Sequence, residues 1–112
     1  MRKKEANVAS NKAYLDFILD QLSSLGGIAH RPMMGEYILY CWGKAFGGIY
    51  DDRFLIKPTE HAKKMMPKAA YELPYEGAKE MLLVDNVEDK AFLAQLVNGV
   101  ADDLPAPKKK KK

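Results

Sequence analysis

The chain has 112 residues, of which 47% are hydrophobic and 29% are charged, with one cysteine and a formal net charge of +3. These values predict a single globular domain without an intramolecular disulfide, in keeping with a reducing cytoplasm. They exclude a membrane span, since no apolar run approaches the roughly 20 residues required, and a secretory signal, since no apolar stretch follows the basic start.

The first predicted element is a helix. Ser10 or Asn11 can cap it, because a short side-chain oxygen satisfies a free N–H of the first turn. Apolar residues then recur every three or four positions as far as Leu25, which is typical of a helix with one buried side. Gly26-Gly27 is expected to end it.

Four short strands separated by tight turns are expected next. They are Ile28–Met34, Glu36–Trp42, Ala45–Tyr50 and Arg53–Lys57. Gly43-Lys44 and Asp51-Asp52 form the predicted hairpin turns. Pro32 favours an edge position for the first strand or a bulge at this residue, because proline cannot donate a hydrogen bond to a neighbour.

The second of these strands carries large apolar side chains on both faces. Tyr37, Leu39 and Cys41 alternate with Ile38, Tyr40 and Trp42. An antiparallel sheet with one solvated face alternates apolar and polar residues instead, so we expect both faces to be covered. In the following strand, Gly47-Gly48 predicts a bulge or the close approach of another backbone.

The remaining elements complete an α-β-β-β-β-α-β-α order. They are a short helix at Glu60–Met66, an irregular segment at Tyr71–Lys79, a strand at Glu80–Val84 and a helix at Val87–Asp103, with Asp85 as its candidate N-cap and Glu88 as the partner in a capping box. This order predicts an α+β fold in which the first and last helices cover one face of an antiparallel sheet of about five strands. Residues 1–9 are expected to be a flexible arm, 10–104 the domain, and 105–112 a disordered Pro/Lys-rich tail.

The residue types do not indicate catalysis, a cofactor or a metal site. His30 and His61 have no cysteine or histidine at the spacing of a metal site. Cys41, in mid-strand, is expected to be a buried structural thiol. No phosphate-cradling, dinucleotide or nucleophile-elbow motif is present. We therefore expect no catalytic, cofactor-binding or metal-binding residue.

Basic charge is concentrated at the two ends. Of 18 basic residues, five lie in 108–112 and three are Arg2, Lys3 and Lys4, which leaves 10 against 15 acidic residues in the body. An acidic body is a poor ligand for phosphate backbones, so nucleic-acid contact would be weak and salt-sensitive. The candidate anion or nucleic-acid contacts are Arg53, Lys57, Lys63, Lys64, Lys108, Lys109 and Lys110. The lysine tail fits equally well with non-specific binding to nucleic acid or an acidic partner and with a solubilising end that has no specific role.

Two segments resemble the N-terminal domain of the TfoX/Sxy competence-regulator family. One is MMGEYILYCWGKAFGGIYDDRFLIK, from Met33 to Lys57, and the other is Pro74-Tyr75-Glu76-Gly77 with Met81 four residues on. The resemblance implies an α+β fold of the secretion-chaperone-like kind, a tendency to self-associate and no established catalytic residues. Full competence regulators carry a second, helical domain, so this chain resembles a stand-alone version.

The leading hypothesis is a non-enzymatic, cytoplasmic regulatory or adaptor module that binds a second copy or another protein. The candidate interface residues are Ile38, Tyr40, Trp42, Gly47 and Gly48. One alternative is weak nucleic-acid association through the basic ends. The other is an unrecognised enzyme or small-ligand binder with a pocket between the sheet and Tyr71–Lys79.

Overall fold

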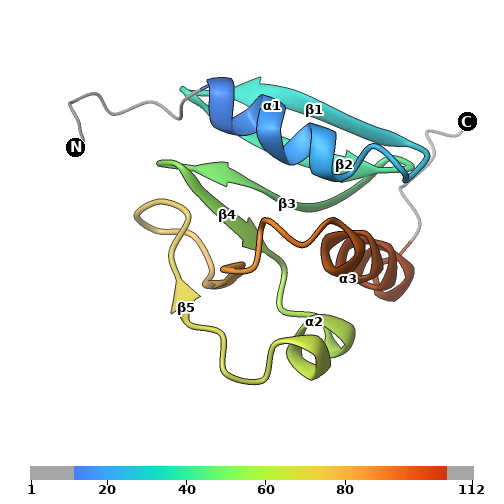
Figure 1. Cartoon of the computed structure of the whole chain (residues 1–112). Helices are drawn as coiled ribbons and strands as arrows, with labels where there is room; N and C mark the ends of the chain where they lie inside the picture. The colour runs from blue at the N-terminus through green and yellow to red at the C-terminus, as the bar shows by residue number, and fades with distance from the viewer. Residues whose placement is uncertain (1–11, 106–112) are drawn as a thin grey trace, which may run out of the picture.

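The computed structural model describes residues 12–105, which form three helices and six strands (Figure 1). In chain order they are α1 (Lys12–Gln21), β1 (Ile28–Met33), β2 (Glu36–Cys41), β3 (Lys44–Tyr50), β4 (Arg53–Ile56), α2 (Glu60–Met65), β5 (Tyr71–Glu72), β6 (Met81–Leu83) and α3 (Lys90–Asp103). The candidate caps Ser10 and Asn11, the predicted arm and the lysine tail lie outside the described residues.

The strands form one antiparallel sheet in the order β1-β2-β3-β4-β6-β5. This arrangement confirms the α+β fold, and it places the strand containing Pro32 at an edge, as predicted. The sheet has six strands rather than about five, because Tyr71 and Glu72 pair with Leu82 and Met81 in a segment expected to be irregular. A strand of two residues is too short to show the alternation by which strands are identified in a sequence.

Three hairpin turns have both central residues in the left-handed region. The turn between β1 and β2 is Met34-Gly35, with φ of 53° and 85°. In the turn between β3 and β4, Asp51 and Asp52 have φ of 55° and 58°, which confirms the predicted position. The turn between β2 and β3 is centred on Trp42 and Gly43, with φ of 51° and 82°, and not on Gly43-Lys44. Turns of this hand match the twist of the strands that they join. The prediction was one residue out, because a tryptophan is unusual in this conformation.

Trp42 therefore leaves the strand on which the sequence placed it. Its backbone N–H donates to the carbonyl of Gly27 at 2.9 Å, and its ring lies against Gly26 and Gly27, where a Cβ on Gly26 would be 2.9 Å from the ring. The side chain is 70% exposed. Trp42 does not extend the row formed by Ile38 and Tyr40, which is a correction to the predicted pattern.

The ends of both long helices also differ from expectation. Helix α1 ends at Gln21 rather than Leu25. Helix α3 is capped by Asp89 and not by Asp85, so the proposed capping box is wrong. The Gln21 side chain donates to the carbonyl of Val87 at 2.8 Å, which holds the segment before Asp89 outside the helix. This contact joins residues far apart in sequence, and no local pattern reports it.

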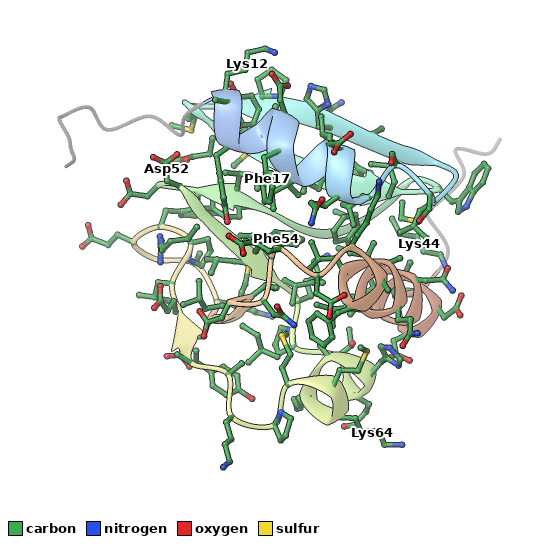
Figure 2. All side chains as sticks on the ribbon, viewed as in Figure 1. Lys12, Phe17, Lys44, Asp52, Phe54 and Lys64 are labelled. Carbon is green, nitrogen blue, oxygen red and sulfur yellow. The ribbon has the colours of Figure 1, made fainter. Side chains whose placement is uncertain are left out.

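Helices α1 and α3 cover one face of the sheet together, as predicted, and α2 lies beside α3 (Figure 1). The core between them contains Leu15 and Ile18 from α1, Leu22 directly after it, Ala62 from α2, Leu93, Leu96, Val97 and Val100 from α3, and Leu39, Phe46, Ile49, Phe54 and Ile56 from the sheet. Figure 2 shows Phe54 in this interior. The Lys44 ammonium donates to the carbonyl of Ala101 at 2.9 Å, which ties β3 to the end of α3.

A bulge and the close approach of another backbone, the two features suggested by Gly47-Gly48, occur beside or at the pair in β3. The register of β2 with β3 shifts by one residue, which leaves Phe46 as the extra residue of a bulge. A Cβ on Gly47 would collide with the carbonyl oxygen of Leu55 in β4, and a Cβ on Gly48 with the carbonyl oxygen of Tyr37 in β2. The backbones that approach the pair therefore belong to neighbouring strands of the same chain.

Helix α3 anchors the first turn of α2. The backbone N–H of His61 donates to Asp103 Oδ2 at 2.8 Å. The His61 ring lies against Gly99, where no side chain intervenes, and its Nε2 is 3.2 Å from the carbonyl oxygen of Gln95. The hydrogen bond from His61 N–H, aided by the Thr59 hydroxyl, lowers the pKa of Asp103 below its ordinary value.

We expect this carboxylate to make stability depend on acid pH. A pKa lowered by folding means that the contribution is complete above the unfolded value of about 3.9 and is lost as pH falls through the lower folded value. The melting temperature of the wild type should therefore exceed that of Asp103→Asn at pH 7, and the difference should shrink below pH 4. Asp102→Asn is the matched control. An equal gap at pH 7 and pH 3 would contradict the assignment.

Candidate functional site

The face of the sheet opposite the helices, which we call the second face, is largely apolar. The register aligns Ile38, Gly48, Leu55 and Leu83 across four neighbouring strands. Tyr50, Leu55 and Met81 form a small buried cluster with Leu83 against it, and this cluster contains no helical residue. Within residues 12–105, the helices therefore leave the second face to be covered by other means.

Residues 73–80 cover the half of the second face formed by β3, β4 and β6. Pro74 in this loop is buried, and the ring of Tyr75 lies 6.2 Å from that of Tyr50 at an angle of 54°. The other half, over β1 and β2, is more open, since Ile38 and Tyr40 are only half-buried. The loop thus provides part of the second cover that the strand pattern required.

A groove separates the loop from the open half of the face. It has a volume of about 560 Å³ and lies between β2 and β3, the loop at 73–80 and the segment that follows β4. The residues important for its chemistry are Ile38, Ala45, Tyr50, Lys57, Tyr75 and Met81. Its position is the one at which the sequence suggested a pocket, between the sheet and Tyr71–Lys79.

Tyr50 closes the floor of the groove. Its ring lies back over Gly48, where an added Cβ would be 2.7 Å from the ring carbon Cε2. Burial raises the pKa of its phenol, and the neighbouring Tyr75 raises it further. The hydroxyl is therefore neutral at physiological pH and can donate a hydrogen bond.

The structure brings together most, but not all, of the candidate interface residues. Ile38, Tyr40 and Gly48 lie on the second face, and Gly47 lines the groove beside them. Trp42 lies in the turn instead. Sequence patterns did not identify Tyr50 and Tyr75 as site residues. Their ring contact joins β3 to a loop 25 residues away. Alternation along β3 was the only available signal, and the bulge interrupts it.

The candidate anion contacts do not form a single patch. The Arg53 guanidinium already has two partners within the chain. Its Nη1 pairs with Glu72 Oε1 at 2.7 Å and its Nε donates to the carbonyl of Tyr50 at 3.1 Å. Lys57 lines the groove. Lys63 and Lys64 are exposed on α2, where Lys64 points away from the body (Figure 2). Lys108, Lys109 and Lys110 lie outside the described residues.

The reactive side chains have structural surroundings. The Cys41 thiol is buried and lies 3.7 Å from the carbonyl oxygen of Gly26, and burial raises its pKa. Among residues 12–105, no three His, Cys, Asp or Glu side chains gather as metal ligands would. In the same range, no helix is both long enough and apolar enough to cross a bilayer.

Comparisons with known proteins find relatives across most of the chain. The sequence model of the TfoX N-terminal domain matches residues 20–99, a range that contains all six strands. A protein of Spirochaeta aurantia, described as an uncharacterized 12.7 kDa protein in the trpE 5′ region, is 34% identical over 105 residues. The alignment covers 93% of this chain and 91% of that protein. No solved structure matches the chain.

Proposed function

Because this chain belongs to the TfoX N-terminal domain family, we propose that it is a non-enzymatic regulatory or adaptor module that acts by binding protein, in the first place a second copy of itself. The family suggests a regulatory or competence-related module. The free, buried thiol of Cys41 supports a reducing, cytoplasmic location.

The open half of the second face is the observation that carries this proposal. Over β1 and β2, the apolar side chains of Ile38 and Tyr40 remain half-buried, and Ala29 and Arg31 beside them on β1 are exposed. A two-fold axis through this area would place the same patch on both copies. Complete burial of a large apolar side chain contributes about 1.5–3 kcal/mol, and these partly buried side chains would contribute part of that range.

The chemistry of the described residues favours binding over catalysis. Nucleophilic catalysis needs a nucleophile within hydrogen-bonding reach of a base. Cys41 contacts a backbone carbonyl, while the contacts of His61 lie at the junction of α2 and α3. A raised thiol pKa also reduces the fraction of reactive thiolate.

We expect Tyr40→Glu to convert a self-associated wild type to a monomer. A carboxylate at the centre of an apolar contact must be desolvated on association, so the dissociation constant should rise by at least about tenfold, or 1.4 kcal/mol. Size-exclusion chromatography with light scattering, across a micromolar to high-micromolar range, measures the change. Circular dichroism should show that the variant remains folded.

Tyr71→Glu is the matched control. Tyr71 is 49% exposed on β5, at the opposite edge of the sheet from β1, so the same substitution there should leave self-association unchanged. A wild type that stays monomeric at high micromolar concentration would refute dimerisation through this face, and equal effects of the two substitutions would refute the assignment to Tyr40.

A further inference from the structure

We infer that the groove on the second face binds a small amphipathic organic anion, whose apolar body lies over Ile38 and Met81 and whose anionic group lies at Lys57. The cavity, of about 560 Å³, is within the usual size range for small-molecule sites. This inference goes beyond the proposed protein-binding role and rests on three features of the groove.

The first feature is uncompensated positive charge. The Lys57 side chain is half-buried at the groove, and its ammonium makes no hydrogen bond or ion pair with any residue in 12–105. Lys79 also lines the groove, and among the lining residues Glu80 supplies the one carboxylate. The described residues as a whole hold 10 basic and 14 acidic side chains, so the groove is locally opposite in charge to its surroundings. A lysine beside an apolar surface favours an anionic ligand.

The second feature is a hydroxyl without a partner on a buried side chain. Tyr50 is only 6% exposed, and its Oη has no hydrogen bond to any residue of the described chain. Buried polar atoms usually have a hydrogen-bond partner. Since the side chain lines the groove, an acceptor atom of a bound ligand would satisfy this hydroxyl.

The third feature is the placement of these groups along β3. The backbone N–H of Lys57 donates to the carbonyl of Phe46 at 2.8 Å, which fixes Lys57 beside the bulge. The ring of Tyr50 lies back over Gly48, two residues from Phe46. The phenol is thus held on β3 and the cation directly after β4, with the apolar surface of Ile38 next to them across β2 and β3.

The test is an NMR titration of ¹⁵N-labelled protein with sodium 2-naphthoate and, separately, with the uncharged 2-naphthalenemethanol. The two probes share a ring system and differ in charge. We expect saturable shifts at Ala45, Lys57 and Ala78, which line the groove, with naphthoate bound at least about tenfold more tightly, as expected for a charge-assisted contact. Equal affinity for the two probes would overturn the anionic class. The absence of saturable groove shifts at millimolar naphthoate would overturn the site.

Variants separate the two polar contacts. Lys57→Met should weaken naphthoate binding by about tenfold and leave the neutral probe unaffected. Tyr50→Phe should weaken it by about threefold, as expected for one neutral hydrogen bond. Lys64→Met, on exposed α2, is the control for loss of one positive charge. Unchanged naphthoate binding by Lys57→Met, or an equal loss in Lys64→Met, would overturn the assignment.

Ligand binding and self-association are measured by independent experiments. The titration reports occupancy of the groove whether the protein is a monomer or a dimer, whereas light scattering reports only the oligomeric state. A monomer that binds naphthoate would support the groove site and refute the proposed dimer. A dimer that shows no groove shifts would do the reverse.

Discussion

Gly47→Ala is expected to lower the free energy of unfolding by about 3 kcal/mol, as overpacking against a rigid neighbour does. The added Cβ would collide with the carbonyl oxygen of Leu55 and lie 2.9 Å from the Cα of Ile56. Both are backbone atoms of β4, which is held on its other side by β6. Relief would require the two strands to separate, because no side chain there can rotate away.

The measurement is urea denaturation followed by circular dichroism. Gly77→Ala is the matched control, because Gly77 has a φ of +88° but open space where a Cβ would be. It should cost about 1–2 kcal/mol, from the left-handed backbone alone. If Gly47→Ala were no more destabilising than Gly77→Ala, the close approach of β4 would not be the reason for glycine at position 47.

The close packing around the glycine pair also affects the candidate site. In the sequence, Gly47-Gly48 predicted a bulge or the close approach of another backbone, and the pair was a candidate interface. The structure assigns the approach to β2 and β4 of the same chain. The functional consequence is indirect, since Gly48 gives the Tyr50 ring the space to fold back and form the floor of the groove.

Local sequence patterns predicted the elements that depend on local physics. The Asp51-Asp52 turn was identified correctly because aspartate itself favours that conformation. The start of α3 and the position of Trp42 were not. Each depends on a contact across the fold, from Gln21 to Val87 and from Trp42 to the backbone of Gly27.

The sequence predicted where the candidate site lies, but not all of the residues that form it. The apolar alternation of β2 indicated a second face to be covered, and Ile38 and Tyr40 are on it. The loop that walls the groove has no periodic pattern, so the contact of Tyr75 with Tyr50 had no sequence signal. The pairing of Arg53 with Glu72 had no sequence signal for a similar reason, since Glu72 lies on a strand of two residues.

Phe46→Ala is expected to lower the free energy of unfolding by about 4 kcal/mol, which is in the range for removal of a buried aromatic ring. Phe46 is the extra residue of the β3 bulge, is fully buried, and meets the ring of Phe54 edge-on at 6.5 Å. The bulge thus directs a large side chain into the core while leaving Gly47 and Gly48 free to pack against neighbouring backbone.

Urea denaturation also measures this effect, with Phe17→Ala as the control. Phe17 is 38% exposed on α1, so its loss should cost about 1 kcal/mol or less. Because a loss of about 4 kcal/mol approaches the whole stability of a small domain, Phe46→Leu provides a milder variant that should cost about 1.5 kcal/mol. Equal costs for the alanine substitutions at 46 and 17 would mean that the bulge does not place Phe46 in the core.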